Sequence, residues 1–281
     1  MTNQIFRPGI AAVTLLVMAS IVLAQSAAEV LEPFALTVQD GGTVNLGTIG
    51  PGQTLAVTVN GVAPGKGGEQ ANWGVLGVLE TPNGWSGFDS AVFAKRMRAT
   101  VKADPGAADG VYTVKFRLTE CEGKFENCVA KQGLGSVTFF GTIRVSKSVL
   151  ATAIPITAVT TGVNQPARYT INIENRGVAN DVFDISAEGV PAWNFKKSVH
   201  VPAGGKVTTF YEIAVNEEKT YLPTITIKSV SSDDLKQSYD VSLVSKSDLA
   251  GDVRATKNGV LLFPMTLEPL YSLMGILGYV V

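Results

Sequence analysis

The stretch that decides the fold is residues 161–202, TGVNQPARYTINIENRGVANDVFDISAEGVPAWNFKKSVHVP. Apolar residues recur at every second position of residues 167–174, on the side occupied by Tyr169, Ile171 and Ile173. A period of two predicts a half-buried β-strand. Turn residues at 175–177 end this strand, and two further strands follow inside the stretch. The pattern predicts an all-β protein of the sandwich type, and it predicts an architecture rather than a reaction.

The composition limits the classes of protein to which this chain can belong. A length of 281 residues is enough for two sandwich domains, and 46% hydrophobic residues suffice for a core in each. The 23 Lys and Arg residues nearly balance the 24 Asp and Glu residues, so no broad basic surface is expected for nucleic acid. The single histidine, His200, argues against a histidine-based metal site and a Ser-His-Asp triad. We therefore expect no metal, no cofactor and no nucleic-acid partner.

The first 28 residues are predicted to be an export signal. Arg7 is the only charged residue before Glu29, and residues 10–24 are apolar. Small residues at 22–24 and 26–28 provide two cleavage sites of the A-x-A kind, which favours a cleaved signal peptide. A retained signal anchor is the alternative, because the apolar run is slightly longer than an ordinary signal core. In both cases the middle of the chain lies outside the cytoplasm.

Cysteine usage agrees with export. Cys121 and Cys128 are the only cysteines, and they stand close together in the sequence CEGKFENC. An even pair in an exported chain predicts a disulfide. The spacing does not match a C-x-x-C redox motif, and two cysteines alone are too few for a metal site. We expect the bridge to close a short loop between two strands.

Two β-sandwich domains are expected in tandem, over residues 30–147 and 148–246, with a short hinge at Ser146-Lys147-Ser148. A polar linker follows at 247–258. The halves look like copies of each other, because PGQT at 51–54 and NQPA at 164–167 both precede an alternating strand. PNGW at 82–85 likewise corresponds to PAW at 191–193. These matches indicate a duplication.

The second domain resembles the NPCBM-associated Ig-like β-sandwich domain, which is close to the CARDB-like adhesion-type domains, and the first domain resembles it only loosely. The order of strands and turns carries the resemblance. Its carriers are Asn175, Gly177, Gly189, Pro191, Trp193, Pro202 and Gly204. The resemblance implies two tandem Ig-like domains, a bacterial or archaeal envelope location, and packing roles for Pro191 and Trp193. Trp85 occupies the place of Trp193 in the first half and is expected in the core.

The C-terminal segment is predicted to be a transmembrane helix. Residues 259–281, GVLLFPMTLEPLYSLMGILGYVV, carry a single charge at Glu268 and are long enough to cross a bilayer. Pro264, Pro269 and the mid-segment Glu268 oppose this interpretation, and a soluble apolar tail is the alternative. A carboxyl group at that depth usually marks a partner, so Glu268 is the candidate contact with another membrane subunit.

Together these features predict an exported, membrane-anchored protein of the cell envelope, extracytoplasmic, with a structural or assembly role. Its partners would be membrane lipid and either another protein or further copies of itself. A carbohydrate-binding or adhesin module is the alternative, because Trp73, Trp85 and Phe88 gather near a glycine-rich loop where aromatic rings can stack on a glycan. A further alternative is an accessory ectodomain subunit of a membrane complex. No residue pattern favours an enzyme, since the acidic residues lie in turns and on polar strand faces.

Overall fold

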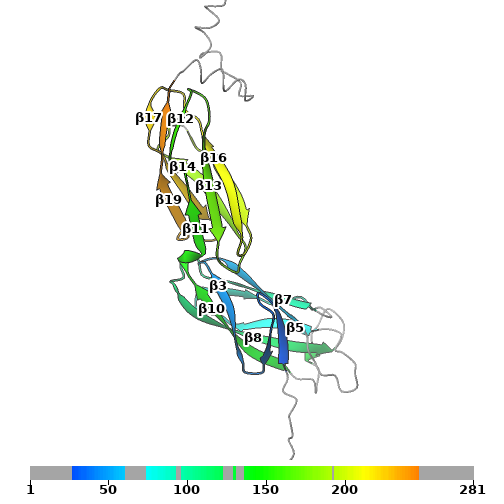
Figure 1. The fold of residues 1–281 in the computed structure, drawn as a ribbon. Coiled ribbons are helices and arrows are strands. Elements are labelled where there is room, and N and C mark those ends of the chain that lie inside the picture. The colour runs from blue at the N-terminus through cyan, green and yellow to red at the C-terminus, as the bar shows by residue number, and fades with distance from the viewer. Residues whose placement is uncertain are drawn as a thin grey trace, which may run out of the picture.

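The computed structural model describes residues 27–60, 74–92, 96–122, 129–130, 136–191 and 193–246. Within these residues the regular structure is β-strand, apart from one 3-10 helix. The strands form two units that lie end to end, and the described chain begins and ends at opposite extremities of the elongated molecule (Figure 1). The predicted all-β class is therefore confirmed.

The first unit is a sandwich of two sheets. The β10–β3 pair is parallel, while the other pairs are antiparallel. One sheet is ordered β2 (Leu36–Gln39), β1 (Ala27–Glu32), β4 (Thr54–Asn60), β7 (Arg96–Lys102) and β6 (Ser86–Phe88). The other is ordered β3 (Thr43–Ile49), β10 (Ser136–Val145), β8 (Gly110–Glu122) and β5 (Gly74–Glu80), with β9 (Val129–Ala130) paired to β8.

The second unit follows the 3-10 helix η1 (Lys147–Val149) and contains three sheets. The first is ordered β11 (Leu150–Ala153), β13 (Ala167–Asn175) and β16 (Lys206–Ile213). The second is ordered β15 (Lys196–Val201), β14 (Asp181–Glu188), β18 (Thr224–Ser229) and β19 (Lys236–Asp240). The third is ordered β12 (Ala158–Thr161), β20 (Ser242–Ser245) and β17 (Thr220–Tyr221), and its β12–β20 pair is parallel.

The strand order in each unit is that of an immunoglobulin-like domain. In constant-type domains, strands A, B, E and D form one sheet and strands C, F and G form the other. Strands β1, β4, β7 and β6 take the first set of places, and β5, β8 and β10 take the second. In the second unit β15 pairs with β14 instead of joining β16, so the strand after C changes sheets. Both units are Ig-like β-sandwiches, and they differ in the placement of this strand and in the separate β12–β20–β17 sheet of the second unit.

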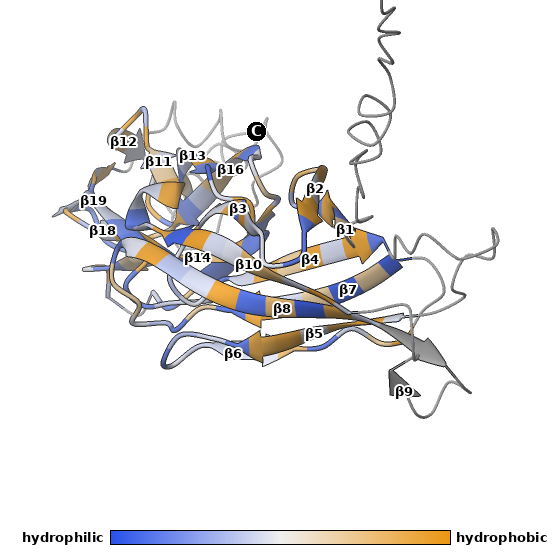
Figure 2. Cartoon of the chain, turned by 90° about the horizontal axis from the view of Figure 1, so that it is seen from below, coloured by the Kyte–Doolittle hydropathy of each residue, from blue (hydrophilic) through white to orange (hydrophobic). Residues whose placement is uncertain are grey.

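Alternating burial forms a separate core in each unit. Along β13 the exposure alternates strictly, which places Tyr169, Ile171 and Ile173 inward as the sequence predicts. Hydrophobic and hydrophilic positions alternate along β8 in the first unit as well (Figure 2). The rings of Phe116 and Phe139 stack in its core with centroids 5.2 Å apart. At about 25 cal/mol per Å² of apolar area removed from water, these two faces supply the main stabilisation of each sandwich.

The expected core position of Pro191 is wrong, because this residue is exposed. Trp193 N–H donates to Val190 O at 3.3 Å, so Pro191 occupies the second place of a tight turn. Proline suits that place because its ring presets φ. Val190, 8% exposed, is the turn residue that enters the core. Trp193 is half-buried at the margin of the core, where its Nε1 donates to Tyr211 Oη at 3.1 Å.

Side chains cover the outer edges of two edge strands. Gln237 accepts a hydrogen bond from Thr152 N at 3.2 Å and donates to Leu150 O at 3.1 Å, so its amide pairs with β11 as a neighbouring strand would. Asp89 and Ser90 accept from backbone N–H groups of β5 at 2.8 and 2.9 Å. Covered edges resist strand addition by another chain. The edges of β5 and β11 are thereby protected.

None of the helices formed by the described residues is long and apolar enough to span a membrane. Residues 1–26 of the predicted signal segment, the polar linker from residue 247 onward and the predicted membrane segment with Glu268 lie outside the residues that the structure describes. Ala27 and Ala28, which are predicted to belong to the signal segment, instead begin β1, and Ala28 is 0% exposed in the first core. The first domain therefore starts at residue 27 rather than at residue 30, and the cleavage site at 26–28 would fall at the edge of this strand.

Candidate functional site

The two domains meet through a buried, polar junction. Gln53 stands just before β4 of the first domain, and Asp181 begins β14 of the second. Gln53 Nε2 donates to Asp181 Oδ2 at 2.8 Å, although the two residues are 128 positions apart in the sequence. Gln53 is 0% exposed and Asp181 is 4% exposed. The contact therefore lies in the interior of the molecule, where it is shielded from competing water.

Asp181 is the central acceptor of this junction. Its Oδ2 also accepts from Ser229 Oγ at 2.7 Å, and its Oδ1 accepts from Ser231 Oγ at 2.9 Å and from Val182 N at 2.8 Å. Each carboxylate oxygen thus receives two hydrogen bonds from neutral donors. A buried carboxylate is costly unless its acceptor sites are filled in this way. Losing one donor from either domain would leave an unsatisfied oxygen in the interior.

A loop of the second domain completes the core of the first. Asn175 is fully buried, and its amide donates to Ala179 O at 2.8 Å and accepts from Gly177 N at 3.0 Å. In the loop that Asn175 holds, Val178 N donates a hydrogen bond to Thr48 O of the first domain at 2.9 Å. Ala179 belongs to the first domain's hydrophobic core, and Val178 packs against it. Asn175 and Gly177, singled out by the resemblance, therefore shape the surface on which the two domains meet.

Close backbone approach at the junction explains the glycine at position 52. Gly52 has φ of +70°, a conformation that favours glycine, and a Cβ atom there would lie 1.9 Å from Ser231 O. Nothing larger than hydrogen fits between the two backbones without moving one domain. The Pro51-Gly52 step before β4 is thus also a domain contact.

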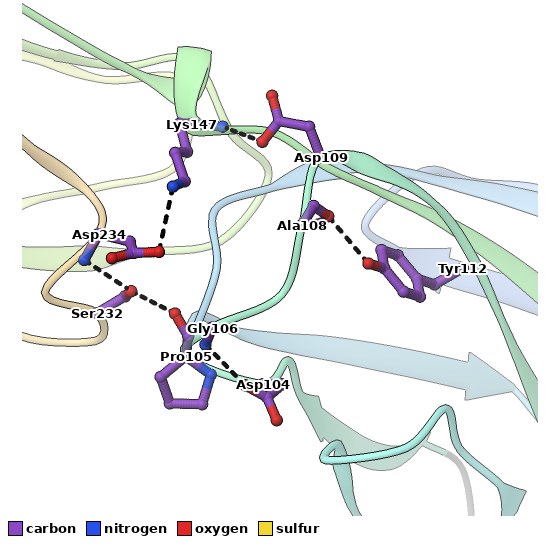
Figure 3. Close-up of polar contacts among 9 residues, drawn as sticks. All are labelled: Asp104, Pro105, Gly106, Ala108, Asp109, Tyr112, Lys147, Ser232 and Asp234. Carbon is purple, nitrogen blue, oxygen red and sulfur yellow. Dashed lines mark hydrogen bonds and ion pairs between the residues drawn. The ribbon is translucent and has the colours of Figure 1, made fainter.

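A second group of contacts joins the domains beside the connecting segment (Figure 3). Ser232 Oγ donates to Pro105 O at 2.5 Å, and Lys147 Nζ lies 3.1 Å from Asp234 Oδ2. The Lys147–Asp234 pair is about half exposed on both sides, so its own contribution to stability is small. Its geometric effect is to fix the connecting segment to the second domain.

The connecting segment is ordered, which corrects the expected hinge at residues 146–148. Ser146 is the N-cap of η1 and accepts from Ser148 N. Asp109 Oδ1 accepts from Lys147 N at 3.1 Å, and Val149 is 2% exposed in the second core. A capped turn with contacts to both domains cannot act as a free swivel.

The polar groups of the junction are suited to a structural contact between the domains rather than to catalysis. Asp181 is surrounded by hydroxyl and amide donors and is closed off from solvent. The described part of the chain contains no group of three or more His, Cys, Asp or Glu side chains that could bind a metal ion. The structure brings Asp181 and the tip at 229–232 together, whereas Asp184 bonds to Ser198 Oγ at 2.6 Å on an outer sheet face.

The other candidate residues are scattered. Trp85 is 8% exposed in the first core, with its ring centroid 5.1 Å from that of Tyr112. Phe88 is 60% exposed on β6, so these two aromatic residues do not form a common platform. Trp73 and Cys128 lie outside the described residues. Backbone pairing of Cys121 with Ala130 shows that β8 and β9 bring the two ends of the cysteine loop near each other.

Gln53, which belongs to the PGQT segment before a predicted strand, was not predicted to be a junction residue. The available signal was a glutamine shortly before a strand in both halves. Gln165, 8% exposed, holds the corresponding place in the second domain. Burial of a glutamine across a domain boundary depends on long-range contacts, and nothing local in the sequence reports them.

The sequence matches no protein-family model and no curated protein. Among solved structures, a chimeric titin Z1Z2 is 13% identical, with 80% of this chain and 99% of that chain covered and a TM-score of 0.33. The fibronectin(III)-like modules of Clostridium thermocellum CbhA are 12% identical, with 78% and 94% covered and a TM-score of 0.26. A β-glucosidase from Listeria innocua is 14% identical over 34% of this chain, with a TM-score of 0.25, and the match spans 16% of that enzyme.

Strand order, the two cores and the junction define the class of this protein: it has two Ig-like β-sandwich domains in tandem. The two domains are joined by a buried polar contact rather than by a flexible linker.

Proposed function

We propose that this is an exported, membrane-anchored protein of the cell envelope, in which two Ig-like domains form a rigid spacer with a structural or assembly role. The observation that carries the proposal is the buried Gln53–Asp181 junction. Connected domains are expected to move relative to each other unless the contact between them is well packed. A closed polar network favours a fixed orientation, which is the property that a spacer needs.

The positions of the chain ends support the same role. The described chain enters at the far end of the first domain and leaves at the far end of the second (Figure 1). Lys246 N donates to Thr161 O at that second end, from which the chain continues toward the predicted membrane segment. An anchor at 259–281 would then hold the second domain near the bilayer and carry the first domain away from it.

The proposed partners follow from this arrangement. Lipid would surround the C-terminal segment, and Glu268 would contact another membrane protein or a second copy of the chain. The proposed role is non-enzymatic, and Asp181, a buried carboxylate, is assigned to holding the two domains together. Nucleic acid is not a proposed partner, because the chain has a net charge of −1.

We also infer that the second domain is of the NPCBM-associated, CARDB-like kind. Its carriers gather in two places. Asn175, Gly177 and Gly204 meet at the junction, where Gly204 N donates to Gly177 O at 3.0 Å. Gly189 and Trp193 frame the turn after β14. These residues shape turns and packing, which is the role that the resemblance implies for the motif residues of this family.

The spacer proposal is tested by measuring the distance between the domains. Spin labels attached by cysteine-independent chemistry at Thr113 and Ser238, both exposed on outer sheet faces, would report it in the full chain in mild detergent. We expect one narrow distance distribution. Gly52→Ala should broaden or shift it, since the new Cβ atom would meet Ser231 O at 1.9 Å.

Gly41→Ala is the matched control. Gly41 has φ of +75°, close to the +70° of Gly52, but a Cβ atom there meets nothing within 4 Å. Both variants therefore introduce similar backbone strain, and only Gly52→Ala disturbs the junction. A broad, multi-peaked distribution in the unmodified protein would overturn the spacer proposal.

A further inference from the structure

The outer face of β7 carries three exposed cations. Arg96, Arg98 and Lys102 stand at alternate positions and point away from the core, whereas the residues between them point inward. Side chains two positions apart on one face are about 7 Å apart along a strand. The row therefore extends for about 20 Å in one direction along the surface of the first domain.

These cations lack partners, unlike the cations of the ion pairs elsewhere. In the described residues no ion pair or side-chain hydrogen bond involves Arg96, Arg98 or Lys102. The carboxylates two strands away, Glu29 and Glu32, are instead bonded to Asn60 Nδ2 at 2.9 Å and Thr58 Oγ1 at 2.6 Å. The positive charge of this row is left available to a ligand, even though the whole chain has a net charge of −1.

An exposed aromatic ring lies on one side of the cations, and small side chains of β4 lie on the other. Phe88, 60% exposed, pairs with Thr100, which lies between Arg98 and Lys102 on the same face. On the other side of β7, Thr54, Ala56 and Thr58 are the cross-strand neighbours, and none of them is large. We call Arg96, Arg98, Lys102 and Phe88 the β7 strip. It is a flat cationic track with one exposed ring at its side.

The strip leads into a hollow at the domain junction. A cavity of about 510 Å³ is lined by Arg98, Thr54 and Ala56, by the acidic residue Glu32, and by Phe34 and Arg176. Phe34 is 48% exposed. Arg176 is already paired with Glu174, at 3.3 Å, and its hydrogen bond lowers the pKa of that carboxyl group. Arg98 is thus the free cation shared by the strip and the hollow.

We propose that the β7 strip binds an acidic polysaccharide, an extended glycan that carries carboxylate groups. A row of cations along one face matches a polymer that carries repeated carboxylate groups, and an exposed phenylalanine offers a face on which a sugar ring can stack. This inference goes beyond the spacer role and rests on different residues from those of the junction.

Other polyanions fit the strip less well. Nucleic-acid binders usually have a basic domain and many phosphate contacts, whereas this chain has a pI of about 5.9 and the strip has three cations. An acidic peptide motif is commonly recognised by arginines clustered around one anionic group. The cations of the strip instead form a row about 20 Å long on a sheet face. A glycan can be bound by side chains alone, without main-chain pairing, and this sheet face presents side chains.

The test is a binding titration of the full chain in mild detergent with a fluorescent polygalacturonate oligomer. We expect saturable binding that weakens as salt is raised, because the contacts are exposed and screened. The triple variant Arg96→Gln, Arg98→Gln and Lys102→Gln should lose about fivefold in affinity for each cation removed. Phe88→Ala should lose about fivefold while its salt dependence stays the same.

The matched control is the double variant Arg117→Gln and Arg144→Gln. These two arginines are also exposed and without ion pairs in the described residues, but they lie on the other sheet. Their loss should leave the affinity unchanged. Carboxyl-reduced polygalacturonate, a neutral polymer of the same length, should not bind. Equal losses in both variants, or equal binding of the reduced polymer, of single-stranded DNA or of anionic vesicles, would overturn the proposal.

Discussion

At the scale of single residues, the equivalence of the two halves is closer than the sequence alone suggests. Gln53 N donates to Gly50 O and Gln165 N donates to Gly162 O, so both glutamines close the same kind of turn. The residues before them, Gly52 and Asn164, both have positive φ, of +70° and +61°. The sequence match of PGQT at 51–54 with NQPA at 164–167 places Gln53 opposite Pro166, one residue away from its structural equivalent, Gln165. The shift arises because Ala167 begins β13 two positions after Gln165, whereas Thr54 begins β4 directly after Gln53.

Only one of the two glutamines became a junction residue. Gln53 lies at the end of the first domain that receives the second, and there it meets Asp181. Gln165 lies at the end of the second domain from which the chain departs, near Lys246. The turn itself was predictable from its glycine and proline. Whether this turn contacts another domain depends on which domain follows it in space, and local sequence does not report that.

Tyr169 makes the stability of the second domain depend on alkaline pH. Its ring is 0% exposed and its hydroxyl donates to Ser242 O at 2.9 Å, and burial raises its pKa to about 12. The unfolded chain releases this proton near pH 10, before the folded chain does. The stabilisation is therefore complete below pH 10 and is lost between pH 10 and about 12, amounting to roughly 2–3 kcal/mol.

Urea unfolding of the full chain at a series of pH values from 8 to 12 measures this effect. Tyr169→Phe should reduce stability at pH 8 by about 1 kcal/mol, for the lost hydrogen bond, and should flatten the alkaline decline. Burial also raises the pKa of Tyr211, so part of the decline should remain in the variant. An unchanged decline in Tyr169→Phe would show that this residue does not cause it.

At the scale of elements, periodicity and turn residues predicted most strands, because burial on one face imposes a period of two that local sequence records. The turns before Trp85 and Trp193 also correspond, with Trp85 N donating to Pro82 O as Trp193 N donates to Val190 O. The next strand could not be placed from sequence. In the first domain β6 pairs with β7, while in the second β15 pairs with β14. Both choices satisfy the same alternating pattern.

The hairpin of β8 and β9 is where the predicted disulfide would lie. Cys121 pairs with Ala130 and Glu122 with Val129, so the backbone returns on itself around the loop that ends at Cys128. We expect Cys121 and Cys128 to be bridged in the exported protein. Closing so short a loop should stabilise the first domain by roughly 2–3 kcal/mol.

Mass spectrometry of non-reduced peptides from the exported protein checks the bridge directly. A single peptide pair joined through Cys121 and Cys128 is the expected result, and two alkylatable thiols would contradict it. Reduction should lower the melting temperature of the first domain and leave that of the second unchanged. The double variant Cys121→Ser and Cys128→Ser should behave as the reduced protein does.

At the scale of the whole molecule, the tandem arrangement was predictable and the junction was not. Length, two alternating halves and a short connection indicate two sandwiches in a row. The expected hinge became a capped turn because Asp109 and Asp234, from opposite domains, both bind Lys147. Those partners lie 38 and 87 residues away, beyond the reach of any local pattern. The contacts that fix the connecting segment thus arise only in the assembled pair of domains.

The predicted membrane segment is the remaining determinant of how the molecule stands in the envelope. Residues 259–281 should hold the full chain in the bilayer. About twenty apolar residues favour insertion, whereas an ionised Glu268 at mid-span would oppose it by about 2–3 kcal/mol. The apolar contribution is larger, so we expect insertion with Glu268 protonated or paired with a neighbouring helix. Pro264 and Pro269 would kink that helix and free carbonyl groups for a partner.

Detergent phase partitioning of the full chain decides the question. The intact protein should enter the detergent phase, and truncation after Asn258 should release a folded, monomeric ectodomain into the aqueous phase. Glu268→Leu should remain in the detergent phase but lose any assembly that the intact protein shows in cross-linking, because leucine removes the polar contact and keeps the apolar length. If the intact chain stays in the aqueous phase, residues 259–281 are a soluble docking segment. The two domains would then be held at the envelope by a protein partner rather than by lipid.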